Sequence, residues 1–199
     1  MHTPNSIARR PHPGVRALAV LAALVVAAAA CSDPFALKAQ YANMPFVYSV
    51  YGISGSGPAN APAALDFATQ ATVRVDGTFA FDIAFDFDGH GKIRIIPQKL
   101  VGAAITGART VGLQRLTGAY EAVVEAPARN WEFDSTLTVL PGEVIGVRIT
   151  SSNCVYQSST ENYSKLVIDS VKAGGLIFGR GVTNPNCGFK SFADGIPKF

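Results

Sequence analysis

The chain has 199 residues, of which 48% are hydrophobic and 16% charged, and its formal net charge is +3. The excess charge comes from three arginines within the first 30 residues, so the remaining 169 residues carry 14 basic and 14 acidic side chains. A neutral domain without a basic run has no electrostatic footprint for nucleic acid. His90 is the only histidine after residue 30, which excludes a multi-histidine zinc site and restricts any Ser-His-Asp or Cys-His mechanism to that side chain. We therefore expect no metal and no cofactor.

The first feature along the chain is an uncharged apolar run of 14 residues, from 17 to 30. Arg9, Arg10 and Arg16 precede it, and small residues end it. A basic segment, a short apolar segment and a small-residue cleavage site together are typical of an export signal. The run is shorter than the ~20 residues that a membrane-spanning helix needs. Residues 1–30 are therefore predicted to be a signal peptide, and the rest of the chain to be exported.

The sequence Ala-Ala-Ala-Cys at the end of this run allows two interpretations. It fits an ordinary signal-peptidase site that is cut after Ala30. It also resembles the lipobox of bacterial lipoproteins, with Ala28 where leucine is usual. That resemblance implies cleavage before Cys31 and a diacylglyceryl thioether on its sulfur. The odd number of cysteines favours lipidation, because a lipid on Cys31 leaves Cys154 and Cys187 to form a disulfide in an oxidising compartment.

After a short tether over residues 31–44, we expect one domain over residues 45–199. Its richness in Phe, Val, Ile, Thr and Gly favours β structure. The first predicted strand is 45–51, and a flexible Gly/Pro/Ala-rich loop follows at 54–64.

The clearest pattern is a hairpin of residues 67–75 and 78–88, joined by Asp76-Gly77 in a type I′ turn. Period-two alternation in its second strand predicts one buried face and one solvent face. The buried face is expected to hold Phe79, Phe81, Ile83, Phe85 and Phe87, and the solvent face Asp82, Asp86 and Asp88.

The part of the chain after residue 91 shows a weaker pattern, and only the approximate ranges of its strands can be predicted. The predicted strands are 92–96, 131–139 and 144–149, and a second hairpin joins 163–171 to 176–182. Within the poorly patterned stretch 98–130, residues 117–126 fit either a short helix or a strand. These elements predict an all-β fold, an antiparallel β-sandwich or a small barrel of about 7–9 strands.

Two groups of side chains are candidates for chemistry. Asp82, Asp86 and Asp88 share one strand face with His90 at the adjoining turn, and carboxylates two residues apart match the wide separation of an inverting glycosidase. The simpler interpretation is that this face meets water. Trp131, Phe133 and the six tyrosines could form a sugar-stacking platform, although aromatic residues in strands more often pack in a core.

The function that these observations favour is a non-catalytic binding or structural module of the bacterial envelope, either periplasmic or at the outer surface. A lipid on Cys31 would hold it at a membrane, and its ligand would be a protein or a glycan. The alternative is a glycan-directed envelope hydrolase that uses acids such as Asp82 and Asp86.

Overall fold

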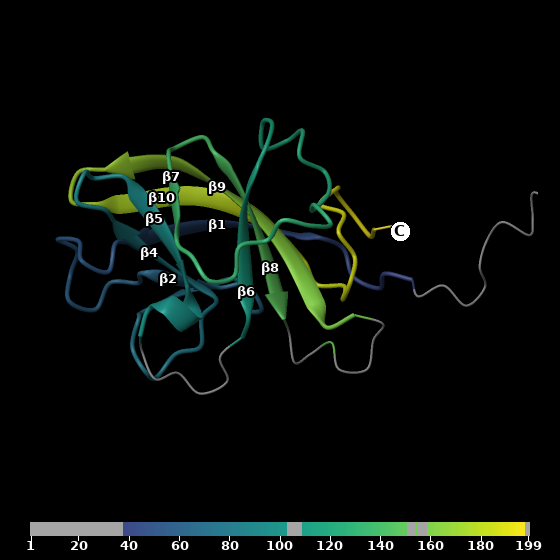
Figure 1. Cartoon of the computed structure of the whole chain (residues 1–199), viewed down its shortest axis with the longest axis horizontal. Coiled ribbons are helices and arrows are strands. Elements are labelled where there is room, and N and C mark those ends of the chain that lie inside the picture. The colour runs from purple at the N-terminus through teal and green to yellow at the C-terminus, as the bar shows by residue number, and fades with distance from the viewer. Residues whose placement is uncertain (1–37, 103–108, 151–153, 155–158, 198–199) are drawn as a thin grey trace, which may run out of the picture. The chain divides into compact units, whose positions relative to one another are not determined.

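The computed structural model describes residues 38–102, 109–150, 154 and 159–197 (Figure 1). The chain divides into two units, Met1–Leu37 and Lys38–Phe199. The predicted signal peptide, Cys31 and the first part of the predicted tether lie outside the described residues. The described part of the second unit contains the following elements: β1 (Met44–Tyr51), β2 (Ala64–Asp66), β3 (Ala71–Val73), β4 (Ile83–Phe87), β5 (Ile93–Pro97), a 3₁₀ turn η1 (Gln98–Leu100), β6 (Val111–Leu116), β7 (Leu137–Val139), β8 (Val144–Thr150), β9 (Glu161–Lys172) and β10 (Leu176–Asn184).

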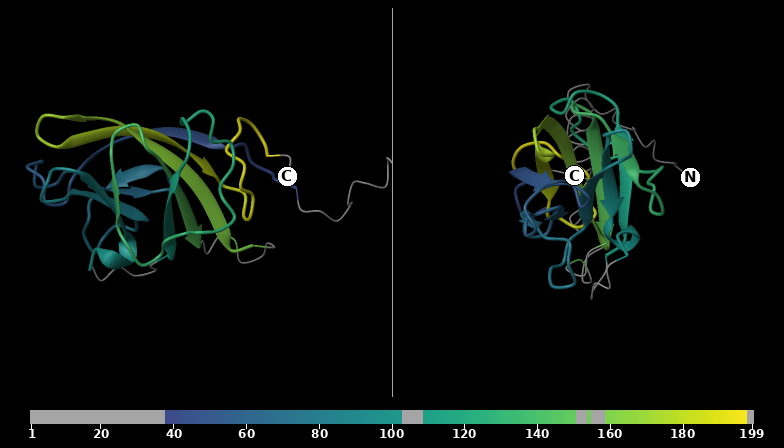
Figure 2. Two further views of the ribbon diagram at one scale, coloured as in Figure 1. Left: turned by 45° about the horizontal axis from the view of Figure 1, so that its top comes forward. Right: turned by 90° about the vertical axis from the view of Figure 1, so that its left-hand side faces the viewer.

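The strands form two antiparallel sheets of five strands each. Sheet A has the order β1-β10-β9-β8-β6, and sheet B has the order β3-β2-β4-β5-β7. The two sheets lie one on the other as layers (Figure 2). The predicted all-β fold is confirmed, and it is a sandwich of two open sheets.

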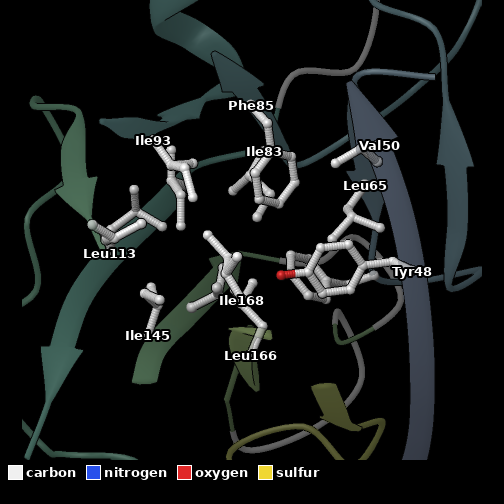
Figure 3. Close-up of a cluster of buried hydrophobic side chains, with 14 of the residues drawn as sticks. Tyr48, Val50, Leu65, Ile83, Phe85, Ile93, Leu113, Ile145, Leu166 and Ile168 are labelled. Carbon is white, nitrogen blue, oxygen red and sulfur yellow. The ribbon is translucent and has the colours of Figure 1, made fainter. Parts of the chain in front are cut away.

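The main core lies between the sheets and is built from alternate side chains of both layers (Figure 3). Its members include Tyr48, Val50, Leu65, Ile83, Phe85, Ile93, Leu113, Ile145, Leu166 and Ile168. The Tyr48 hydroxyl donates a hydrogen bond to the Val167 carbonyl at 3.1 Å, so the one polar group of this set is satisfied. Removal of this apolar surface from water is the main force that holds the two layers together.

A second apolar cluster covers part of the outer face of sheet A. Side chains of the segment 117–133 and of the C-terminal tail pack there, and backbone hydrogen bonds join Ala126 to Lys190 (2.8 Å) and Phe192 to Val124 (2.7 Å). The members of the cluster are Leu116, Val123, Ala126, Trp131, Val144, Tyr163, Val182 and Phe192. Sheet A is therefore buried partly on both faces.

Several predicted elements are confirmed. The first strand is β1, the hairpin in the last third of the chain is β9–β10, and β4 pairs with β5 across the Gly-His-Gly turn at 89–91. Pairing ends at Pro97, as expected for a residue that cannot donate to a ladder. Residues 117–126 contain turns and a single bridge from Glu125 to Ser191, in place of a helix or a regular strand. Of the predicted strand 131–139, only β7 and an isolated bridge at Glu132 form.

The predicted pairing of residues 67–75 with 78–88 is wrong. β2 lies between β3 and β4 and pairs with both. The chain reverses between β2 and β3 at residues 67–70, where Gln70 has a φ of 56°. Gly77 lies between β3, which ends at Val73, and β4, which begins at Ile83, and these two strands do not pair with each other. β2 was missed because its three residues, Ala-Leu-Asp, are too few to show a period-two pattern.

Nor do the five apolar residues of the second predicted strand share one buried face. Ile83 and Phe85 belong to the main core, whereas Phe81 belongs to a separate small cluster and Phe79 is 38% exposed. β4 begins only at Ile83, so the alternation of a strand does not extend back to these residues. As a consequence, Asp82 is fully buried and does not lie on a solvent face.

Candidate functional site

The structure separates the side chains of the predicted polar cluster, which are Asp82, Asp86, Asp88 and His90. Asp86 Oδ1 accepts hydrogen bonds from the Ser54 backbone N–H (3.0 Å) and hydroxyl (2.5 Å). Asp88 Oδ1 accepts from the backbone N–H groups of His90 and Lys92, both at 2.8 Å, and so shapes the turn between β4 and β5. The Asp86 and Asp88 carboxylates therefore each stabilise a loop, and Asp82 lies in another environment.

The pKa values of Asp86 and Asp88 fit these local roles. Burial raises the pKa of Asp86, but the hydrogen bonds from Ser54 outweigh it and leave the pKa below its ordinary value. The hydrogen bond from the Lys92 N–H is the main cause that lowers the pKa of Asp88. Both carboxyl groups are therefore ionised at neutral pH. A general acid must carry its proton at the working pH, so neither group is suited to that role.

Asp82 belongs to a cluster with Asp66 and Arg109 at one end of the sandwich. Asp82 Oδ2 accepts the Phe67 N–H at 2.7 Å, and Asp82 Oδ1 lies 3.2 Å from Arg109 Nε. Arg109 Nη2 donates to Asp66 Oδ1 at 2.8 Å, so one guanidinium joins both carboxylates. The Arg109 backbone N–H donates to Gln98 Oε1 at 3.2 Å. The cluster thus ties together the end of β2, the start of β4, η1 and the chain that leads into β6.

The protonation of Asp82 is strongly affected by its surroundings. Burial raises its pKa to about 7; Arg109 and the Phe67 N–H act in the opposite direction, and Asp66 adds to the rise. Perturbed acids of this kind occur both at active sites and in structural ion-pair networks. Geometry decides between the two for Asp82.

A small cavity of about 90 Å³ adjoins Arg109 between the two sheets. Arg109, Asn162 and Thr183 are its polar lining residues, and the others are apolar side chains from both layers together with Ala68. Asp82 is not among them and has no exposed surface, so a molecule in this cavity would meet the guanidinium and not the carboxylate. A general acid or base must come within hydrogen-bond reach of its substrate. The cluster is therefore suited to hold the end of the sandwich together.

The sequence did not point to Asp66 or Arg109. Asp66 had a local signal, because its Oδ1 accepts the Ala68 N–H (3.1 Å) and its Oδ2 accepts the Thr69 hydroxyl (2.7 Å), as in the side-chain turns that Asp favours. Arg109 lies in the poorly patterned stretch, and its two carboxylate partners are 27 and 43 residues away in the chain, so no local pattern could have found it.

The predicted disulfide is confirmed. Cys154 and Cys187 are bonded, with their Cα atoms 5.6 Å apart, and both side chains are buried. The bond joins the chain that precedes β9 to the chain that follows β10, which lie at the same end of sheet A. Two of the three cysteines are thereby used.

Of the aromatic residues predicted as a sugar platform, Trp131 and Phe133 are packing residues. Trp131 is buried, its Nε1–H donates to the Pro127 carbonyl at 3.1 Å, and its ring lies 5.9 Å from that of Tyr163. The ring of Phe133 covers Gly112, where an added Cβ would come within 2.7 Å of it, and Arg148 lies 5.5 Å from its centroid. Neither ring offers an open face of the kind that stacks on a sugar.

No protein-family model, curated protein or solved structure matches the chain. Within the described ranges, no helix has the length and apolar character for a membrane crossing. The same part of the chain holds no group of three or more His, Cys, Asp or Glu side chains placed to bind a metal ion. The fold and the site thus define an antiparallel β-sandwich with one disulfide and an ion-pair cluster at one end.

Proposed function

We propose that the protein is an exported, lipid-anchored β-sandwich that acts as a non-catalytic binding module of the bacterial envelope. The observation that carries the proposal is the Cys154–Cys187 disulfide. It accounts for two cysteines in the way expected of an oxidising compartment, and it leaves Cys31 as the one thiol directly behind an apolar, arginine-preceded run. Lipid on Cys31 explains both the odd cysteine and its position.

The placement of the acids favours binding over hydrolysis. A glycoside hydrolase needs two carboxyl groups on either side of one bond, roughly 5–9.5 Å apart and open to the substrate. Asp82 is fully buried against Arg109, and Asp86 is held by Ser54 at a loop. The alternative of a glycan-directed hydrolase based on these two acids therefore gains no support from their geometry.

The experiment that tests the anchor is the substitution Cys31→Ser in the native host, with Ser32→Ala as its matched control. Two or more acyl chains hold a protein stably at a membrane, whereas one chain does so only marginally. We expect wild type and Ser32→Ala in the membrane fraction and Cys31→Ser in the soluble fraction, or accumulated as an uncleaved precursor. A Cys31→Ser protein that matures normally and stays membrane-bound would refute the proposal.

A further inference from the structure

A hollow of about 360 Å³ opens on the outer face of sheet A. One wall is the segment around Tyr120, the other is the C-terminal tail around Phe192, and residues of β1, β9 and β10 form its floor. The volume is enough for a single sugar ring, in contrast to the cavity of about 90 Å³ beside Arg109. The hollow is also separate from the Asp66–Asp82–Arg109 cluster, none of whose residues line it.

Lys165 is the notable residue of this hollow. Its side chain rises from β9, and it is 4% exposed. Its ammonium donates to the carbonyls of Tyr120 (2.5 Å) and Val123 (2.7 Å) and lies 4.1 Å from the centre of the Tyr120 ring. Among the described residues, no carboxylate lies within 4.0 Å of it. A buried ammonium without an anionic partner is costly and is stabilised by any further acceptor.

The hollow is lined by one cation, Lys165, and two anions, Glu121 and Asp194. Glu121 is paired with Arg180 at 3.2 Å, and Arg180 also lies 3.6 Å from Asp169, which is outside the hollow. This leaves Lys165 and Asp194 as a lining cation and a lining anion without an ion-pair partner in the described structure. Burial lowers the pKa of Lys165, while Glu121 and Asp194 raise it, which places both acids within electrostatic reach of the ammonium.

These two opposite charges select the class of ligand. A simple anion would be repelled by Asp194, and a simple cation by Lys165. A hydroxyl group can accept from an ammonium and donate to a carboxylate at the same time. The remaining lining of Pro45, Val124, Val182, Phe192 and Ala193 offers apolar contact to a C–H face. A molecule with several hydroxyls and an apolar face combines these properties.

We propose that this hollow binds one neutral sugar residue, with hydroxyl groups between Lys165 and Asp194. The inference rests on the proposed function and names its ligand class, a saccharide of the envelope. Lys165 also fixes the turn at residues 119–123 through its two carbonyl contacts, so the wall of the site is formed before a ligand arrives.

The test is a titration of the full chain, kept in detergent micelles, followed by backbone amide NMR. The probes are glucose, galactose, mannose and N-acetylglucosamine, with glycine, acetate and methylammonium as charged comparisons. We expect at least one sugar to bind with a millimolar Kd and to shift the amides of Tyr120 and Ala193. The three charged probes should leave these amides unshifted at the same concentrations.

Two exposed positions allow variants that keep the fold. Asp194→Asn replaces a charge-assisted hydrogen bond with a neutral one and should weaken sugar binding about fivefold to tenfold, with Glu125→Gln outside the hollow as its control. Ala193→Trp should fill the hollow and abolish binding, while Ala128→Trp should not.

The proposal is overturned if no sugar shifts these amides at a sugar concentration of about 50 mM, which is 50 times a Kd of 1 mM. It is also overturned if glycine binds there instead. It is equally overturned if sugar binding survives Ala193→Trp in a variant whose circular dichroism is native. These outcomes do not depend on the lipid anchor. A chain that binds sugar but is soluble in the cell would refute the anchor alone.

Discussion

Asp82 is the residue whose environment departs most from what its neighbours in the sequence suggest. Its carboxyl group is fully buried, and burial raises its pKa to about 7 from an ordinary value of 3.8. Between these values the folded protein binds a proton that the unfolded chain has already lost. The stabilisation from Asp82 is therefore complete below about pH 4 and is lost as the pH rises through 7.

This makes a prediction for the substitution Asp82→Asn. The amide oxygen can still accept the Phe67 N–H, but the side chain no longer ionises. We expect the unfolding free energy of the wild type to fall by roughly 1–4 kcal/mol between pH 5 and 8, and that of Asp82→Asn to fall much less. Urea titrations at several pH values measure both.

The matched control is Asp86→Asn. The pKa of Asp86 is lowered, so it titrates below pH 5 and the variant should keep the wild-type slope over this range. Parallel pH profiles of the wild type and Asp82→Asn would mean that Asp82 stays ionised against Arg109 throughout.

At the scale of the element, the alternation of apolar residues around β4 begins at Phe79, four residues before the strand itself begins at Ile83. Phe81 and Phe85 are both fully buried, but Phe81 lies with Ala64 and Ala84 in a small cluster, away from the main core that contains Phe85. Phe79 is 38% exposed, with Arg74 5.4 Å from its ring centre. The three phenylalanines that alternate in sequence thus occupy three environments.

We predict a corresponding order of destabilisation. Phe81→Ala and Phe85→Ala should each cost about 3–5 kcal/mol of unfolding free energy, because each removes a fully buried ring. Phe79→Ala should cost about 1 kcal/mol or less, because part of its ring is in water and only a surface cation–π contact is lost. Denaturant midpoints at constant m-value rank the three. If Phe79→Ala were as unstable as Phe85→Ala, the result would instead support the interpretation that both side chains share one buried face.

The two hairpins that were predicted correctly combine alternation with an adjacent turn that contains glycines, although the same combination at residues 67–88 predicted a wrong pairing. β9 and β10 flank glycines 174 and 175, which both adopt positive φ, and β4 and β5 flank the turn at 89–91. β2 could not be predicted, because its three residues form a strand only through their pairing with β3 on one side and β4 on the other. Pairings of that kind depend on tertiary contact more than on local propensity.

The candidate sites were less predictable than the fold for a related reason. Arg109 joins acids from distant parts of the chain, and Lys165 meets carbonyls 42 and 45 residues away. From the sequence of β9 alone, Lys165 would be expected to face solvent, since it stands between Ser164 and Leu166. Only the segment that crosses the outer face of sheet A buries it. The cysteine pair could be predicted because the number of cysteines is counted over the whole chain and needs no local pattern.

At the scale of the whole molecule, the disulfide connects the sandwich to the tail that covers it. Cys187 lies just after β10. The chain beyond it supplies Phe192 to the outer cluster and Ala193 and Asp194 to the hollow on the outer face of sheet A. Residues 185–197 form no strand, and the tail is held by hydrogen bonds from several other segments. The Phe192 N–H donates to the Val124 carbonyl (2.7 Å), and the Asn43 side chain donates to the carbonyls of Ser191 (2.9 Å) and Ala193 (2.6 Å). A covalent bond at its start keeps these contacts within reach.

The double substitution Cys154→Ser with Cys187→Ser should therefore act both on global stability and on the tail. The bond closes a separation of 33 residues, and its loss should lower the unfolding free energy by roughly 3–4 kcal/mol on the chain-entropy account. Urea unfolding of the double variant against the wild type under non-reducing conditions measures this. Ser170→Ala, at an exposed position near the other end of β9, serves as the substitution control. Hydrogen exchange should in addition quicken at Phe192 before it does at Leu166, because Phe192 lies outside any strand whereas Leu166 belongs to β9, which is paired with a strand on each side. Equal stability together with an unchanged Phe192 exchange rate would show that the outer cluster holds the tail by packing alone.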